Sequence, residues 1–150
     1  MNISDDGVDF LKRWEKLSLV VYPDGYGYDT VGYGHRVLDG EDFSGGITED
    51  EAESILLSDL EWAELAVNKY VKTDLTQNQY DALVSFTLNV GASAFKKSTL
   101  LKLVNIPGDD DEDEQFKRWV KAGGRRSRGL ERRRKAEIAV FNEGDYDYEP

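Results

Sequence analysis

Carboxylates are the side chains best suited to do chemistry in this sequence, because the other common catalysts are scarce. The 150-residue chain has no cysteine and a single histidine, His35. These counts exclude a disulfide framework, a thiolate nucleophile, a cysteine-based zinc site and any site that needs two imidazoles. Thirty Asp and Glu residues remain, so only their context can single out candidates.

Glu15, Asp24 and Thr30 stand in such a context. Glu15 ends an amphipathic segment, Asp24 lies in a Pro-Asp-Gly turn, and Thr30 opens a glycine-rich strand. A helix end and a facing hairpin could place the three groups on opposite walls of one groove. Glycoside hydrolysis needs two such carboxylates, one to donate a proton and one to activate water or attack the sugar. The alternative is purely structural, with a surface Glu, a turn-forming Asp and a strand-forming Thr.

The elements that must position these residues are predicted from hydrophobic spacing and turn residues. Apolar residues at helical spacing predict a helix over residues 3–16, with Ser4 as its N-cap. Residues 17–38 contain β-branched and aromatic residues, a turn signal, and then a stretch dense in Gly and Tyr. This composition favours short antiparallel strands.

The rest of the chain is expected to be helical. Capping boxes at Thr48 and Thr76 begin two longer helices, the second of which ends at Gly91. Shorter helices are expected over three further segments: 93–105, 116–123 and 130–142.

Two acidic stretches are expected to lie outside the core. Residues 109–114 are all acidic and predict a solvated loop that leads into a helix. The chain after Gly144 is expected to be frayed. A helix, a small sheet and then only helices make an α+β fold, and 150 residues fit one domain over 1–150.

Several motifs resemble the phage-type lysozymes, the endolysins that cut bacterial peptidoglycan. The first is Glu15, eight residues, Asp24, five residues and Thr30, followed by Gly-Tyr-Gly-His at 32–35. The segments 75–91 and 98–101 and the C-terminal pattern at 119–141 also match. The likeness covers residues 8–144 in order, through several independent motifs.

The resemblance implies a two-lobed, lysozyme-like fold. A small β lobe, about residues 17–45, would face a mainly helical lobe across a groove. The helical lobe would comprise about residues 71–144 together with the helix at 3–16. A long helix near 48–70 would join the two lobes.

The resemblance also implies an activity, namely hydrolysis of the β-1,4 bond between N-acetylmuramic acid and N-acetylglucosamine. Glu15 would be the general acid, and Asp24 would act on a water that Thr30 helps to place, with inversion of configuration. No metal or organic cofactor is implied, because acid/base chemistry on a glycoside needs none. The positions that match residues near the family's substrate cleft are Gly34, Arg36, Leu88, Asn89 and Ser98.

Two supporting contacts are expected around this site. Arg133 matches a family position near the catalytic Glu, so we expect it to orient Glu15, although a guanidinium favours the ionised carboxyl and opposes the acid role. We expect His35 to pair with Asp59 as a structural contact. The alternative is that His35 serves as a catalytic base.

The charge distribution suggests a contact surface. The chain carries a net charge of −11, which argues against a general nucleic-acid binder. Residues 117–135 nevertheless hold ten Lys or Arg residues and one acidic residue, a net charge of +9. This segment is expected either to meet the anionic cell wall or to be a solvated helix face.

Localisation is predicted from what the sequence lacks. No apolar run approaches the roughly 18 residues of a membrane span, and the acidic N-terminus is unlike a secretory signal. We expect a monomer, with no membrane partner, that is made in the host cytoplasm and acts on peptidoglycan after release. Phage relatives imply that a holin would allow that release.

Two other functions remain open at this point. A lytic transglycosylase on a related fold would release anhydro products and would need no water-directing pair like Asp24 and Thr30. A non-catalytic module would bind the cell wall or nucleic acid through the basic residues between 125 and 135.

Overall fold

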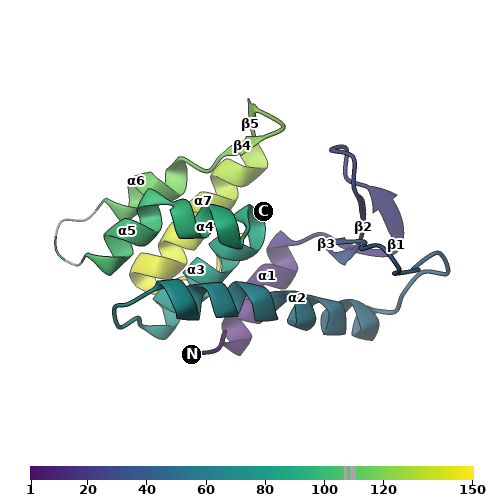
Figure 1. Cartoon of the computed structure of the whole chain (residues 1–150), viewed down its shortest axis with the longest axis horizontal. Helices are drawn as coiled ribbons and strands as arrows, with labels where there is room; N and C mark the ends of the chain where they lie inside the picture. The colour runs from purple at the N-terminus through teal and green to yellow at the C-terminus, as the bar shows by residue number, and fades with distance from the viewer. Residues whose placement is uncertain (107, 109–110) are drawn as a thin grey trace.

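Helices make up most of the computed structural model, which describes residues 1–106, 108 and 111–150 (Figure 1). The elements in chain order are α1 (Asp5–Trp14), β1 (Leu17–Pro23), β2 (Asp29–Tyr33), β3 (His35–Arg36), α2 (Glu49–Tyr70), α3 (Gln77–Val90), α4 (Ala92–Lys97), α5 (Thr99–Asn105), α6 (Glu112–Lys117), β4 (Lys121–Ala122), β5 (Arg125–Arg126) and α7 (Arg128–Glu143). In the described part of the chain, no helix is both long and apolar enough to cross a membrane.

The β lobe is a three-stranded antiparallel sheet in the order β1-β2-β3. Tyr22 pairs with Thr30, so the loop that holds Asp24 starts beside the strand that holds Thr30. The turn from β2 to β3 is made by Gly34 at φ +79°, a conformation that glycine adopts without strain. The sheet therefore places Asp24 and Thr30 at one end of the lobe.

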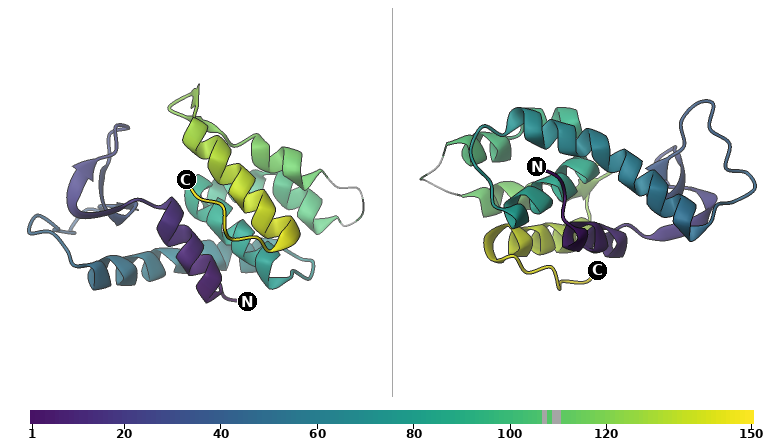
Figure 2. Two further views of the ribbon diagram at one scale, coloured as in Figure 1. Left: turned by 180° about the vertical axis from the view of Figure 1, so that it is seen from behind. Right: turned by 90° about the horizontal axis from the view of Figure 1, so that it is seen from below.

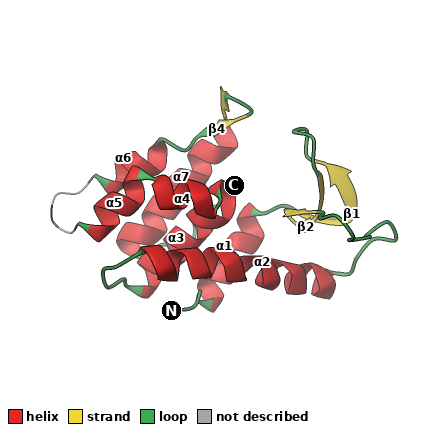
Figure 3. Cartoon of the chain, in the orientation of Figure 1, coloured by secondary structure: helices red, strands yellow, loops and turns green. Residues whose placement is uncertain are grey.

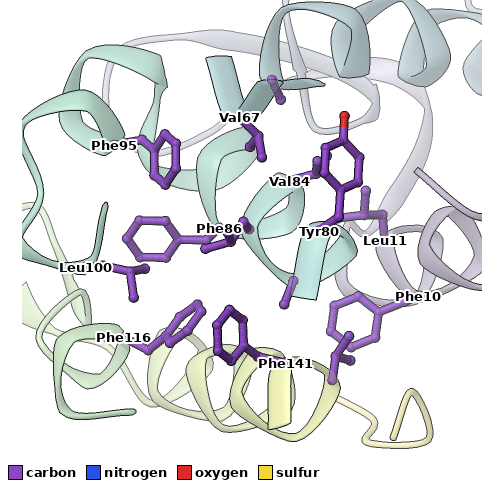
Figure 4. Close-up of a cluster of buried hydrophobic side chains, with 14 of the residues drawn as sticks. Phe10, Leu11, Val67, Tyr80, Val84, Phe86, Phe95, Leu100, Phe116 and Phe141 are labelled. Carbon is purple, nitrogen blue, oxygen red and sulfur yellow. The ribbon is translucent and has the colours of Figure 1, made fainter. Parts of the chain in front are cut away.

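The helical lobe surrounds one buried cluster, shown in Figure 4. Helix α3 lies at its centre, and eight consecutive residues, 80–87, are buried. The Phe86 ring meets those of Phe95, Phe116 and Trp119 edge-on, with centroids 6.4, 5.5 and 5.6 Å away. Full burial stabilises each of the three phenylalanine side chains by roughly 1.5–3 kcal/mol, so this cluster fixes the wall opposite the β lobe.

Helix α2 joins the two lobes, as the resemblance predicted. It begins at the expected capping box, where Thr48 Oγ1 accepts a hydrogen bond from the Glu51 backbone at 3.1 Å. Its first turn contributes Ala52 to a small cluster with Val31 and Ile47 under the sheet. Its later turns join the helical core. The α+β prediction, with a small sheet and a mainly helical lobe, is confirmed.

The prediction of helices alone after the first sheet is wrong (Figure 3). Helix α6 ends at Lys117, and β4 and β5 form a two-stranded hairpin. The turn residues Gly123 and Gly124 have φ values of +57° and +78°. Two consecutive positive φ values suit a tight hairpin turn, so the glycine pair makes a hairpin turn instead of ending the helix expected over 116–123.

The prediction of a frayed tail after Gly144 is wrong for Asp145 and Tyr146. Figure 2 shows the tail returning alongside α1. The Tyr146 hydroxyl donates a hydrogen bond to Asp81 at 2.7 Å. The backbone carbonyl of Tyr146 accepts a hydrogen bond from the Arg13 side chain. The predicted acidic loop at 109–114 lies partly outside the described residues, and its last three residues form the first turn of α6.

Candidate functional site

A cleft of about 680 Å³ lies between the β lobe and the helical lobe. Residues from α1, the sheet, α2 and α3 line it together. The three sequence-predicted catalytic residues are all among them. The lining residues are Glu15, Asp24, Thr30, Tyr33, Gly34, His35, Arg36, Leu38, Leu56, Asp59, Trp62, Leu88, Asn89, Val90 and Gly91.

Glu15 sits where α1 stops. It is the C-cap, with an extended backbone and an N–H that donates to Leu11 at 2.7 Å. Its side chain is 20% exposed, and Oε1 accepts a hydrogen bond from Arg133 Nη1 at 2.6 Å. On the other side, a Cβ placed on Gly34 would lie 2.8 Å from Oε2. Glu15 is thus held between the last helix and the turn from β2 to β3.

Asp24 and Thr30 differ in how their polar atoms are used. The Asp24 Oδ1 atom accepts hydrogen bonds from the backbone N–H groups of Tyr26 at 2.7 Å and Tyr28 at 3.1 Å. Within the described chain these bonds use only Oδ1. Thr30 is 4% exposed, and its buried hydroxyl has no partner among the described residues. Among the described residues, Asp24 Oδ2 therefore accepts no hydrogen bond, and the Thr30 hydroxyl is unpartnered but covered by protein.

His35 bridges two carboxylates at the side of the cleft. Its Nδ1 lies 2.8 Å from Asp59 Oδ2, and its Nε2 lies 2.9 Å from Glu41 Oε1. Burial lowers the pKa of His35, but the hydrogen bonds to Glu41 and Asp59 outweigh burial and raise it. The hydrogen bond from His35 lowers the pKa of Glu41, whereas burial raises the pKa of Asp59. The structure brings the expected pair together and adds Glu41.

Arg133 and Arg134 are buried in ion pairs rather than exposed on a basic face. They are 4% and 1% exposed, and both contact Glu137, which is fully buried. Burial lowers the pKa of Arg133, but the charges of Glu15 and Glu137 outweigh burial and raise it. Glu15 therefore faces a guanidinium that stays charged.

Four of the five predicted substrate positions line the cleft, namely Gly34, Arg36, Leu88 and Asn89. The Arg36 guanidinium lies over the Tyr28 ring, 4.0 Å from its centroid. The structure does not bring Ser98 to the cleft. It caps α5 instead, and its buried hydroxyl accepts a bond from the Leu101 backbone at 3.1 Å.

Sequence reasoning missed Trp62 and Leu38 on the cleft wall. Trp62 is 39% exposed and follows Asp59 by three residues in α2. Residues three apart share a helix face. The expected pairing of Asp59 with His35 could therefore have indicated that Trp62 also faces the cleft. Leu38 lies in a loop, where no periodicity indicates which way a side chain faces.

Eight of the ten Lys and Arg residues of the basic segment 117–135 are exposed, whereas Arg133 and Arg134 are buried. We call the eight exposed cations the basic surface: Lys117, Arg118, Lys121, Arg125, Arg126, Arg128, Arg132 and Lys135. Several belong to the β4–β5 hairpin, which Figure 1 shows on the helical lobe, opposite the loop between β1 and β2. In the described residues, no group of three or more His, Asp and Glu side chains is arranged to hold a metal ion.

The chain is similar to known proteins along most of its length. The family model for phage lysozyme matches residues 12–137. The endolysin of Bacillus phage PZA is 42% identical over 149 residues, which cover 96% of this chain and 56% of that protein. The chain thus spans little more than half the length of that relative. The endolysin of Salmonella phage P22 is 40% identical over 144 residues, which cover 94% of this chain and 98% of that protein.

A solved structure gives the same relationship. The endolysin from Escherichia coli O157:H7 phage FAHEc1 superposes with a TM-score of 0.89 and 38% identity, covering 97% of this chain and 96% of that one. The match of the family model and the identity to these relatives show that the chain belongs to the phage lysozyme family.

Proposed function

We propose that the protein hydrolyses the β-1,4 bond between N-acetylmuramic acid and N-acetylglucosamine in bacterial peptidoglycan. The observation that carries the proposal is the presence of Glu15, Asp24 and Thr30 on one cleft. One carboxylate stands at a helix end, and the other stands in a loop of the facing lobe. This arrangement suits a pair of carboxylates that flanks a glycosidic bond.

In the proposed reaction, Glu15 donates its proton to the glycosidic oxygen as the bond from that oxygen to C1 breaks. A water held by Asp24 and the Thr30 hydroxyl attacks C1 from the opposite face, and Asp24 accepts the proton that the water loses. The configuration at C1 is thereby inverted. Proton exchange with solvent then returns Glu15 to its protonated form and Asp24 to its ionised form.

The place of Thr30 in the cleft wall, on the strand beside the loop of Asp24, supports the water-positioning role. A buried hydroxyl without a hydrogen bond is costly, so such groups are usually satisfied by protein or by water. The Thr30 hydroxyl belongs to a residue of the cleft wall. Asp24 keeps Oδ2 for the same water while Oδ1 binds the loop backbone.

His35 takes a structural role in this proposal. Both ring nitrogens lie within 3 Å of carboxylate oxygens, at 2.8 and 2.9 Å. An imidazole engaged at both nitrogens has no free position from which to take a substrate proton. The contact ties the sheet to α2 and to the loop that carries Glu41.

The basic surface gives the proposal a second part, contact with the anionic cell wall. Its eight cations sit on a chain of net charge −11, so they would orient the molecule toward an anionic polymer. The protein would act as a monomer, because one chain supplies both walls of the cleft.

The test is clearing of a purified peptidoglycan suspension by the protein and by Glu15→Gln. We expect clearing by the first and none by the second, with circular dichroism showing that both fold. Products that end in reducing N-acetylmuramic acid exclude a transglycosylase, which releases anhydro ends, and NMR of the fresh anomer reports inversion. A folded parent that binds peptidoglycan without cutting it would instead indicate a binding module.

A further inference from the structure

We propose that Glu137 is a positioning residue for Glu15, because it shares the charge of Arg133 and so leaves Glu15 able to hold a proton. The inference rests on the proposed acid role of Glu15. It concerns a buried carboxylate that does not itself line the cleft.

Glu137 is fully buried in α7, yet it carries three polar contacts. Its Oε2 accepts hydrogen bonds from the Ser85 hydroxyl at 2.6 Å and from Arg133 Nε at 3.3 Å. Its Oε1 accepts a bond from Arg134 Nη1. Glu137 therefore binds both guanidinium groups and the Ser85 hydroxyl at once.

Arg133 stands between Glu137 and Glu15. Its Nη1 donates to Glu15 at 2.6 Å, and its Nη2 donates to the Ser85 carbonyl at 3.2 Å. Two different N–H groups of one guanidinium, Nε and Nη1, thus donate to two carboxylates. The attraction that Arg133 exerts on Glu15 is therefore opposed by the negative charge of Glu137 just behind it.

Arg134 completes a neutral set of two cations and two anions. It bonds Asn89 Oδ1, donates from Nε to the Trp119 carbonyl at 2.9 Å, and lies 5.0 Å from the centroid of the Phe86 ring. In the described chain, Glu137 is its only ion-pair partner. Without Glu137, two buried guanidinium groups would remain, and Glu15, bonded to Arg133, would be the one anion paired with either of them among the described residues.

An acid catalyst must keep its proton at the working pH until the leaving oxygen accepts it. An opposite charge nearby favours the ionised carboxyl by roughly 1–3 pH units. The Glu137 carboxylate reduces that effect while the Arg133 hydrogen bond still fixes the direction of the Glu15 side chain. The cluster can therefore orient Glu15 while Glu137 offsets part of the Arg133 charge.

Other ionisable groups surround the cluster, and they remain in place in the variants proposed below. Asp81 lies one turn before Ser85 on α3 and is held by the hydroxyls of Ser4 and Tyr146. Asp113 on α6 accepts a bond from Asn142 at the far end of α7. The other charged or titratable groups that line the cleft are Asp24, Tyr33, His35, Arg36 and Asp59.

The test compares Glu137→Gln with a charge-balanced double variant, Arg134→Met with Glu137→Met. The single change buries an excess positive charge and risks unfolding, whereas an apolar replacement of a whole ion pair is often tolerated. The matched control is Glu143→Gln, the same chemical change at an exposed position of α7. Circular dichroism identifies the folded variants.

Two readouts follow for each folded variant, namely the pH–activity profile and the NMR titration of the Glu15 carboxyl carbon. For the double variant, which also removes the Arg134 charge, we expect the alkaline limb of the profile and the NMR titration of Glu15 to move slightly to lower pH. For Glu137→Gln we expect both to move to lower pH by about one unit. Activity at pH 7 then falls about tenfold, while Glu143→Gln changes neither quantity.

The NMR titration separates this proposal from the proposed function, because it needs no turnover. A shift of Glu15 in a protein that clears no peptidoglycan would support the charge sharing and contradict the enzymatic role. An unshifted titration in a folded variant would overturn the charge sharing. If neither variant folds, Glu137 serves stability alone and the proposal is wrong.

Discussion

Trp62 is an aromatic side chain at the cleft that the proposed chemistry does not use. Its indole is 39% exposed on the wall formed by α2. Sugar rings present apolar C–H faces, and an aromatic ring offers a large apolar surface at little cost in side-chain entropy. Trp62 therefore suits a sugar of the glycan that lies away from the bond being cut.

Replacing Trp62 with Ala should weaken binding of N-acetylglucosamine oligomers to the inactive Glu15→Gln protein. A loss of about 1 kcal/mol, the scale of aromatic packing, corresponds to roughly a fivefold rise in Kd. Calorimetry with oligomers of increasing length measures it. Leu65→Ala is the matched control, since Leu65 is 69% exposed on the same helix and is not among the described cleft residues. Equal affinities in the two variants would remove Trp62 from the binding site.

The His35 contacts make stability depend on pH in a direction that can be worked out. Hydrogen bonds to Glu41 and Asp59 raise the pKa of His35, so its contribution is complete below the unfolded value of about 6.5 and disappears as pH rises through the raised pKa. The His35 bond lowers the pKa of Glu41, so that contribution is complete above its ordinary 4.5 and disappears as pH falls through the lowered pKa. The contacts therefore stabilise most between about pH 4.5 and 6.5.

Substituting His35 with Asn should lower the free energy of unfolding by about 1–3 kcal/mol near pH 5.5. The difference from the parent should shrink by pH 9, because neutral His35 loses its ionic attraction to both carboxylates. Urea unfolding at the two pH values measures this. Turnover at an unchanged fold should be retained. A collapse of turnover without loss of stability would assign His35 to the chemistry.

At the scale of elements, the turn between β2 and β3 is where sheet geometry meets Glu15. Gly34 has φ +79°, and any Cβ there would lie 2.8 Å from Glu15 Oε2. Substitution should therefore have two separate consequences, backbone strain and displacement of the carboxylate.

Gly34→Ala is expected to lower both stability and clearing activity, with activity falling at least tenfold. Gly40→Ala provides the control, because Gly40 has φ +88° with open space around it. Both variants should lose more than about 1 kcal/mol of stability through the left-handed backbone. Only Gly34→Ala should lose activity in the fraction that stays folded. Similar activity in the two folded variants would show that the turn does not position Glu15.

Sequence patterns predicted elements best where one local signal sufficed. The capping boxes at Thr48 and Thr76 both form, because each depends on residues three apart. The hairpin at 121–126 was missed because Gly-Gly fits either a helix end or a tight turn, and pairing across the turn decides between them. The place of Tyr146 against α1 was missed because its partners Asp81 and Arg13 are distant in sequence.

The candidate site likewise has a part that local sequence signals predict and a part that depends on residues distant in sequence. The spacing of Glu15, Asp24 and Thr30 and the family resemblance predicted which residues would share the cleft. The full set of partners of Arg133 could not be predicted, since a charged helix face and a buried ion cluster have similar spacing. Burial decides between them, and in the structure Arg133 and Arg134 turn inward while Arg132 and Lys135 remain exposed.

At the scale of the whole molecule, charge is divided between an acidic body and the basic surface. A net charge of −11 repels an anionic wall, whereas the eight exposed cations attract it. Salt screens both interactions, with a Debye length of about 10 Å at 0.1 M. The two effects of salt therefore oppose each other.

Clearing activity should peak at an intermediate salt concentration. Low salt leaves the repulsion of the acidic body unscreened, and high salt removes the attraction of the basic surface. A salt series on the parent and on Arg125→Gln with Arg128→Gln measures this, and the double variant should lose activity at the peak. A steady decline from the lowest salt would show that the basic surface dominates throughout.

The ion pair between Glu15 and Arg133 joins positions 118 residues apart. During translation, Glu15, Asp24 and Thr30 leave the ribosome early, and the arginine follows only after most of the chain has been made. A nascent chain that has not reached residue 133 therefore carries the three cleft residues without the partner that holds Glu15. The candidate site can be completed only after the last helix has been made.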